Sequence, residues 1–233
     1  MPAGTLFITG DPDADRLLNT DPLALLLGML LDQQVPMEWA FKGPATLKDR
    51  IGDLDANAIA AMDPEAVVAV FCDKPALHRF PASMARRAHE LCVFLSERYD
   101  GDAAALWTGV ETGGELLHRL RELPGYGEEK AQIFLAILGK RFSVRPKGWQ
   151  EAAGRFGDAT PRSVADIDSP ESLAKVREFK KAMKAAKRDK QGRPDPAAAE
   201  KVAAPTKKAA VAKKAPVKKA AAAAKKTTAA KKK

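Results

Sequence analysis

The chain has 233 residues, of which 45% are hydrophobic, and carries 39 Lys and Arg against 30 Asp and Glu. The positive excess lies at the C-terminal end: residues 184–233 hold 17 basic and 3 acidic side chains, leaving 22 basic and 27 acidic ones in residues 1–183. Two cysteines exclude a disulfide framework, a four-cysteine zinc site and a cysteine-ligated iron–sulfur cluster. The slightly acidic segment 1–183 is long enough to form its own hydrophobic core.

The sequence gives no sign of secretion or of a membrane span. Residues 1–10 lack the charged region and long apolar run of a secretion signal, and the strongest apolar run, residues 23–31, is too short to cross a bilayer. We therefore expect a soluble cytoplasmic protein that does not bind membranes. In that compartment Cys72 and Cys92 are expected to be reduced, half-buried thiols.

Helical signals dominate residues 1–183, whereas strand signals are weak. Asp21-Pro22, Asp63-Pro64 and Ser169-Pro170 each place a capping side chain before a proline, which is typical of the first turn of a helix. Residues 4–9 look strand-like, but a lone strand has no partner. We expect an all-α fold, with further helices at about 37–47, 56–62, 82–98, 112–123 and 128–138, the last ended by Gly139.

The most specific feature is the segment Leu123-Pro124-Gly125-Tyr126-Gly127 between two amphipathic helices. The proline ends the first helix, and Gly125 and Gly127 permit a tight turn. The second helix then begins with unpaired amides, which together with the helix dipole form an anion site that suits a DNA phosphate. The surrounding sequence has a local surplus of about four positive charges, from Arg119, Arg121, Lys130, Lys140, Arg141, Arg145 and Lys147 against Glu122, Glu128 and Glu129.

This segment resembles the helix-hairpin-helix motif of the HhH-GPD superfamily of DNA glycosylases, which act in base-excision repair. Residues 25–34, ending in Asp32-Gln33-Gln34, are similar to the early helix and Gln-containing turn of that superfamily. The similarity covers roughly residues 20–160. It implies a two-lobed helical domain over residues 1–183, with the hairpin at 114–139, no iron–sulfur cluster and no other cofactor.

The resemblance also implies a mechanism. A glycosylase of this kind binds double-stranded DNA as a monomer, rotates a damaged or mismatched base into a pocket and cleaves its N-glycosidic bond. A carboxylate stabilises the positive charge that develops on the sugar, and some members add a lysine that forms a Schiff base. In this chain Gln33 and Gln34 would lie near the flipped base and the gap it leaves.

The sequence departs from the family at the catalytic positions. Aligned on the hairpin, the family's lysine falls on Glu129, with Lys130 one place later, and its aspartate falls on Lys147. A cation there opposes an oxocarbenium-like transition state. Three alternatives remain: another carboxylate takes over (Glu129, Glu151 or Asp32); Lys147 or Lys130 is the nucleophile; or the protein binds lesions or the nucleoid without catalysis. For both lysines a phosphate contact is the competing and favoured role.

The neighbouring sequence indicates whether each aromatic residue or histidine lies in the core or at the surface. Trp39 and Trp107 are expected in the core, whereas Tyr126, Trp149 and Arg145 are expected on the DNA-binding face. Surface or capping positions are expected for the three histidines, and no metal site is predicted, because their spacing does not match that of metal ligands. The histidines are His78, His89 and His118.

Residues 184–233 have the composition of a disordered cationic tail. From about residue 191 nearly every residue is Ala, Lys, Pro, Thr or Val, and the lysines come in pairs. Such a segment cannot bury a core and attracts polyanions through counterion release. It predicts sequence-independent DNA binding and association with the nucleoid; the alternative is a solubility tail or a binder of another polyanion.

Overall fold

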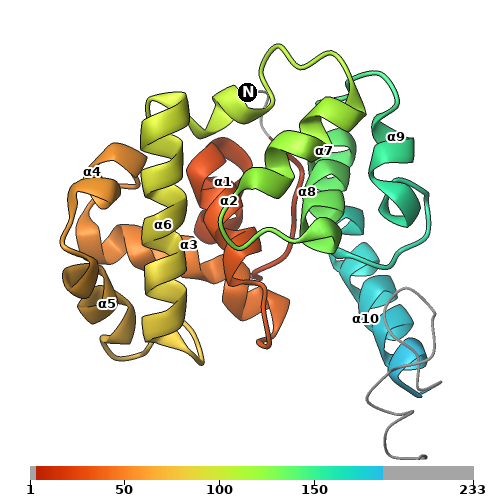
Figure 1. Cartoon of the computed structure of the whole chain (residues 1–233). Coiled ribbons are helices and arrows are strands. Elements are labelled where there is room, and N and C mark those ends of the chain that lie inside the picture. The colour runs from red at the N-terminus through yellow and green to blue at the C-terminus, as the bar shows by residue number, and fades with distance from the viewer. Residues whose placement is uncertain (1–3, 186–233) are drawn as a thin grey trace, which may run out of the picture. The chain divides into compact units, whose positions relative to one another are not determined.

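The computed structural model describes residues 4–185, which form helices and no strand, so the predicted all-α class is confirmed for this part of the chain (Figure 1). The predicted boundary at 183/184 lies inside the last helix: of the segment 184–233 expected to be disordered, residues 184 and 185 belong to this helix, and the remainder lies outside the described residues. The α-helices are α1 (Pro12–Thr20), α2 (Pro22–Leu31), α3 (Met37–Ile51), α4 (Ala56–Ala61), α5 (Pro64–Cys72), α6 (Pro81–Tyr99), α7 (Gly113–Glu122), α8 (Glu128–Arg141), α9 (Trp149–Ala152) and α10 (Pro170–Ala185), and the 3₁₀ turns are η1 (Ala103–Leu106), η2 (Gly154–Phe156) and η3 (Val164–Asp166).

The proline-marked helix starts are confirmed. The Asp21 carboxylate accepts hydrogen bonds from two amides in the first turn of α2, and Asp63 does the same for α5. Asp11-Pro12 carries the same signal and opens α1, which the sequence analysis did not predict. Residues 4–9 are not a strand: the Leu6 amide donates to Asn19 of α1 instead of to another strand.

Helix α8 is longer than predicted, because Gly139 does not end it. The helix continues to Arg141. A Cβ atom at position 139 would lie 2.4 Å from the ring of Trp149, so the glycine permits close packing of α9 against α8. Gly139 is therefore needed for packing and not as a helix stop.

Helix α2 lies at the centre of this arrangement. Leu23–Leu31 are all buried, and in Figure 1 α3–α6 lie on one side of α2 and α7–α10 on the other. Its uninterrupted apolar sequence follows from contact with neighbours all around. Trp107 is 5% exposed and belongs to the core as predicted, whereas Trp39 is 42% exposed, so its prediction was wrong.

The structure tests the expected burial of the two cysteines and the expected absence of a membrane span. Cys92 is buried and Cys72 exposed, so neither is the half-buried thiol that we expected. Burial raises the pKa of the Cys92 thiol to about 12, which keeps it protonated and unreactive. Between residues 4 and 185, no helix combines the length and the apolar character that a bilayer span requires.

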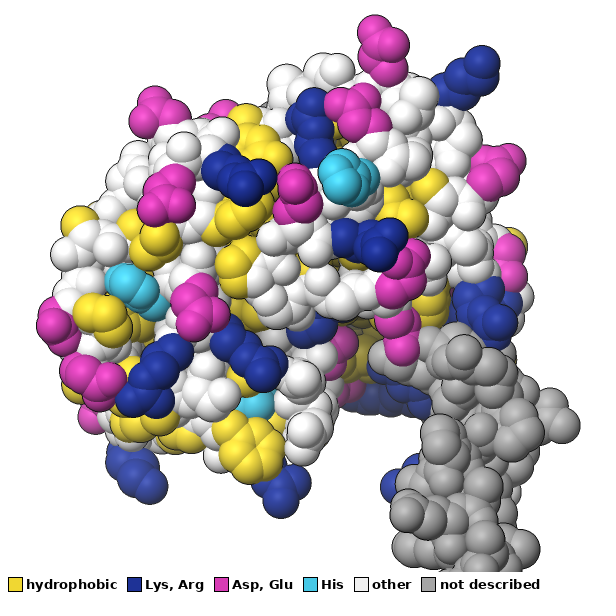
Figure 2. Space-filling model, in the orientation of Figure 1, with side chains coloured by type: hydrophobic (Ala, Val, Ile, Leu, Met, Phe, Trp, Pro, Cys, Tyr) yellow, Lys and Arg dark blue, Asp and Glu magenta, His cyan; other side chains and the backbone are white. Residues whose placement is uncertain are grey.

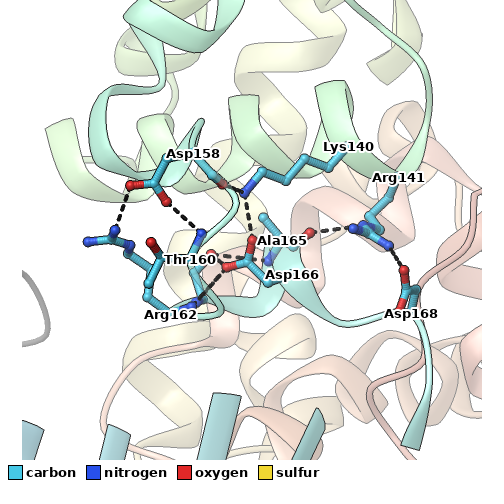
Figure 3. A network of polar contacts seen from close by, with 9 residues as sticks. Lys140, Arg141, Asp158, Thr160, Arg162, Ala165, Asp166 and Asp168 are labelled. Atoms are coloured by element: carbon cyan, nitrogen blue, oxygen red, sulfur yellow. Dashed lines mark hydrogen bonds and ion pairs between the residues drawn. The ribbon is translucent and has the colours of Figure 1, made fainter. Parts of the chain in front are cut away.

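A polar network joins the C-terminal end of α8 to residues 158–168 (Figure 3). The Lys140 ammonium donates to the Asp158 carbonyl at 2.5 Å and to the Asp166 carboxylate at 2.6 Å. The other Asp166 oxygen accepts from the amides of Arg162 and Ser163. Since this carboxylate serves several donors at once, it fixes the segment against α8.

Asp166→Asn should lower the free energy of unfolding by about 3 kcal/mol, because it leaves the Lys140 ammonium without its buried counter-charge. The two side chains are only 12% and 8% exposed. Urea denaturation measures the change. Asp13→Asn is the matched control: it breaks the Arg16–Asp13 pair, whose side chains are 71% and 81% exposed, and should cost less than about 0.5 kcal/mol. Equal losses in the two variants would contradict the role given to the network.

Candidate functional site

Helices α7 and α8 form a hairpin, and its turn, residues 123–127, rests on α2. Gly125 has φ +80°, and a Cβ atom there would lie 2.5 Å from Cδ1 of Leu30. The Tyr126 hydroxyl donates to the carbonyl of Leu26 at 2.8 Å. The turn therefore needs a glycine for two reasons, a left-handed backbone and close contact with α2.

Tyr126 is a buried anchor and not an exposed stacking ring. Its side chain is 5% exposed and makes an edge-to-face contact with Phe134, with ring centroids 5.8 Å apart. Burial raises the pKa of its hydroxyl well above the usual value, so the group remains a hydrogen-bond donor. The prediction that Tyr126 lies on the DNA-binding face is contradicted, because the ring is enclosed by the core.

Lys130, in the first turn of α8, has a role that the sequence analysis did not consider. Its ammonium donates to the Leu30 carbonyl at 2.8 Å and lies 5.9 Å from the centroid of the Tyr126 ring. Leu30 is in the last turn of α2, where carbonyls lack intrahelical partners and the helix dipole favours a cation. Lys130 thus caps α2.

The Gln turn, residues 32–34, is held by His78 and Arg87. The Gln33 carbonyl accepts from Nε2 of His78 at 3.0 Å, and the Gln33 side-chain oxygen accepts from Arg87 at 2.7 Å. Nδ1 of His78 accepts from the Phe80 amide, which places the ring proton on Nε2. His78 is only 2% exposed, so the expectation of a surface histidine was wrong. Gln34 is exposed and has φ +57°.

The Gln turn and the hairpin line one open pocket of about 480 Å³, which we call the hairpin pocket. Two half-buried carboxylates, Asp32 and Glu129, lie in its wall. Seven of the residues singled out in the sequence as catalytic or DNA-binding candidates meet there, namely Asp32, Gln33, Gln34, Gly125, Gly127, Glu129 and Lys130. The rest of the wall is Met29, Glu128 and Ile133.

Lys147 lies elsewhere. Its backbone bonds with Glu111 and Gly113 at the start of α7, whereas the hairpin turn follows the end of this ten-residue helix. A helix of that length spans about 15 Å. The structure therefore separates Lys147, which is exposed, from the hairpin pocket.

The other predicted residues outside the hairpin pocket lie near the C-terminal end of α8 and in α9. Arg145 donates from Nε to the Gly139 carbonyl at 2.9 Å. Trp149 packs over Gly139 and is half-buried, and Glu151 is exposed on α9. Arg145 and Trp149 line a second open pocket, of about 820 Å³, together with Lys140 and the acidic residues of the network in Figure 3. Glu151 is therefore not placed to act in the hairpin pocket.

The local positive surplus expected at the hairpin is largely neutralised. Four of its cations form ion pairs, Arg119–Glu115, Arg121–Glu128, Lys140–Asp166 and Arg141–Asp168. Figure 2 shows basic and acidic side chains interspersed over this face. In addition, the first turn of α8 contains Glu128 and Glu129, which the helix dipole favours and which repel a phosphate. The hairpin is therefore not a basic patch.

Within residues 4–185, the His, Cys, Asp and Glu side chains form no group of three or more that could hold a metal ion. His78 uses both ring nitrogens in hydrogen bonds with the backbone. The chemical groups that the hairpin pocket offers are thus carboxylates, one ammonium and side-chain amides.

Stability should depend on pH through His78. Burial, and to a smaller extent the nearby charge of Lys130, lower the pKa of the folded imidazole from 6.5. The unfolded chain therefore binds a proton first, and the free energy of unfolding should fall as pH drops from about 6.5 to the folded pKa. The slope for one proton is at most about 1.4 kcal/mol per pH unit. Urea denaturation between about pH 5 and pH 7.5 measures it.

His78→Gln should remove this part of the pH dependence. His118→Gln is the matched control, because the His118 side chain is 75% exposed, and its pH dependence should be that of the wild type. An unchanged slope in His78→Gln would contradict the burial of a neutral imidazole beneath the Gln turn.

Comparison of the chain with protein-family models, with curated proteins and with solved structures finds no match. The resemblance to the helix-hairpin-helix glycosylases therefore depends on the residues of the Gln turn and the hairpin. Those two segments are nearly 100 residues apart in sequence and line the same pocket. Any function assigned to the chain starts from that pocket.

Proposed function

We propose that this protein is a DNA-binding protein of base-excision repair, similar to the helix-hairpin-helix DNA N-glycosylases. It binds double-stranded DNA as a monomer in the cytoplasm, in association with the nucleoid. It receives a flipped, damaged or mismatched base in the hairpin pocket. The observation that carries the proposal is the meeting of the Gln turn and the hairpin around two carboxylates.

The size and chemistry of the hairpin pocket support this function. A volume of about 480 Å³ lies in the range of small-molecule sites, and the pocket is open enough for a base to enter from a DNA strand. Side-chain amides such as those of Gln33 and Gln34 can bond the edge of a base or fill the space it vacates. The pocket thus has groups both for reading a base and for reacting with its sugar.

For the reaction, we assign the carboxylate role to Glu129 or Asp32. As the bond between the base and the sugar lengthens, positive charge develops on the sugar, and a nearby carboxylate stabilises it. Water then adds to the sugar carbon and the base leaves with a proton. Lys130 is the less suitable catalytic group, because its ammonium caps the Leu30 carbonyl.

In this proposal the hairpin grips the DNA backbone through its amides more than through charge. Gly127 precedes the first turn of α8 and has no side chain with which to cap the helix, so in this proposal its N–H meets a phosphate. Because Arg121 is paired with Glu128, long-range attraction to DNA falls to other cations. Residues 184–233, with 17 Lys and Arg, have the composition for that role.

A second candidate function is lesion or nucleoid binding without catalysis. One observation favours it: the position at which the family has its aspartate is Lys147, an exposed residue at the far end of α7 from the hairpin. A protein with this change would keep the pocket and lose the usual catalytic group. The two functions make the same prediction for binding and opposite ones for product formation.

The wild-type protein should release a base from at least one duplex in a panel carrying single oxidised, alkylated, deaminated or mismatched bases. Glu129→Gln or Asp32→Asn should reduce the rate at least about a hundredfold, by removing the charge that stabilises the transition state. Strand cleavage after alkali, read on a denaturing gel, measures product, and borohydride trapping detects a Schiff base.

Glu151→Gln is the control, because this acid lies outside the hairpin pocket and should leave the rate unchanged. A trapped adduct that is lost in Lys147→Ala would move the chemistry away from the hairpin pocket. Tight binding with no product on any duplex would favour the non-catalytic function.

Gly127→Pro should weaken binding to duplex DNA about tenfold, because it removes an amide that bonds a phosphate. The φ of Gly127, −82°, is compatible with proline. Fluorescence anisotropy at about 0.3 M salt, which screens nonspecific attraction, measures the affinity. Gly127→Ala is the matched control: it keeps the amide, and its Cβ atom would meet no atom within 4 Å. Equal affinities for both variants would contradict the hairpin grip.

A further inference from the structure

Two large hydrophobic side chains are exposed in the described part of the chain, and they flank the same buried histidine. Trp39, on α3, and Phe80, just before α6, are each 42% exposed. Their ring centroids lie 6.4 Å and 6.1 Å from that of His78. Because His78 is buried and held by two hydrogen bonds, it supports both rings from beneath. We call Trp39 and Phe80 the aromatic platform.

One cation contacts the aromatic platform, and three more bond residues next to it. The guanidinium carbon of Arg79 lies 5.3 Å from the centroid of the Phe80 ring. Arg87 bonds the side chain of Gln33 close by. From α10, Arg177 pairs with Glu38 and the Lys180 ammonium lies 3.4 Å from the sulfur of Met37, which places two more cations beside the residues that precede Trp39.

The contacts just described involve four cationic side chains and one acidic side chain, that of Glu38, so positive charge predominates among them. Aromatic rings among guanidinium and ammonium groups are the combination with which proteins bind single-stranded nucleic acid, since bases stack on the rings and phosphates lie on the cations. An apolar protein partner would not need so many cations around two rings. The chemistry of this patch therefore suits unpaired DNA.

The aromatic platform also adjoins the hairpin pocket. The imidazole between Trp39 and Phe80 donates to the carbonyl of Gln33, which lines the pocket. A strand that delivers a base to the hairpin pocket therefore has exposed rings within reach for the neighbouring bases. Stacking on them would compensate for the stacking that those bases lose when the duplex opens.

We propose that Trp39 and Phe80 stack unpaired nucleobases of a DNA strand, and that Arg79, Arg87, Arg177 and Lys180 contact its phosphates. This inference rests on the proposed DNA-binding function and adds a specific ligand to it: single-stranded or locally unpaired DNA beside the hairpin pocket. Each ring contributes about a tenfold gain in affinity, and neither ring contacts the bases of a fully paired duplex.

The test compares the full-length wild-type protein with Trp39→Leu/Phe80→Leu. Anisotropy at about 0.3 M salt measures affinity for a labelled single strand and for its fully paired duplex. The double variant should lose about a hundredfold in affinity for the single strand and change less than about threefold for the duplex. Trp39→Tyr/Phe80→Tyr should restore single-strand binding, because tyrosine also stacks.

Phe94→Leu is the matched control. Its ring also lies against an arginine, with the Arg98 guanidinium carbon 5.0 Å from the ring centroid, but at a different part of α6. This variant should bind the single strand as the wild type does. The comparison separates stacking at the aromatic platform from the general loss of an aromatic ring beside an arginine.

The outcomes distinguish this inference from the proposed function. If the leucine variant binds the single strand like the wild type while Gly127→Pro still weakens duplex binding, the aromatic platform is wrong and the proposed function stands. If the leucine variant loses single-strand and duplex affinity equally, the rings contact paired DNA and the inference is overturned. If the wild type binds neither DNA, both fail.

Discussion

The attachment of the hairpin to α2 is the interaction on which the rest of the site depends. Helix α2 is buried along Leu23–Leu31, so the carbonyls at its C-terminal end, which lack intrahelical donors, need donors from elsewhere in the protein. The Lys130 ammonium of the hairpin supplies this donor for Leu30, and the Tyr126 hydroxyl adds a hydrogen bond to the carbonyl of Leu26, which lies inside the helix. A buried carbonyl that loses its donor is costly, and this cost fixes the first turn of α8 beside the end of α2.

This attachment also determines which side chains face the hairpin pocket. The residues after α2 are the Gln turn, and the residues around Lys130 are the first turn of α8, so joining the two helix ends brings both segments to one pocket. The same contact commits Lys130 to Leu30. Asp32 and Glu129 contribute carboxylates to the wall of the same pocket, and the proposed reaction assigns the charge-stabilising role to one of them and not to the Lys130 amine.

Local signals made much of the fold predictable from the sequence. Asp21-Pro22 and Asp63-Pro64 act within one helical turn, so no distant residue changes their meaning. The failures share a different property. Gly139 has the sequence of a helix stop, but Trp149 packs against it and the helix continues. Trp39 follows an apolar helix and is nevertheless exposed.

The sequence predicted which residues line the candidate site better than it predicted what each side chain does there. Gln33, Glu129 and Lys130 do line one pocket, yet the partner of Lys130 is 100 residues away in sequence, and no local pattern indicates it. Burial was mispredicted for the same reason: Tyr126 and His78 carry polar atoms and were expected at the surface, but both are buried and support the structure from inside. A role depends on the group that a side chain meets, and this is a property of tertiary packing.

The distribution of charge along the chain separates attraction to DNA from positioning on it. The hairpin holds acids paired with arginines, so charge there does little to attract DNA; amide geometry would act only once the backbone is already close. The excess cations lie in residues 184–233 and around the aromatic platform. Attraction and positioning are thus assigned to different parts of the chain. Such a division favours a protein that scans DNA without sequence preference and selects a site through the bases that leave the stack.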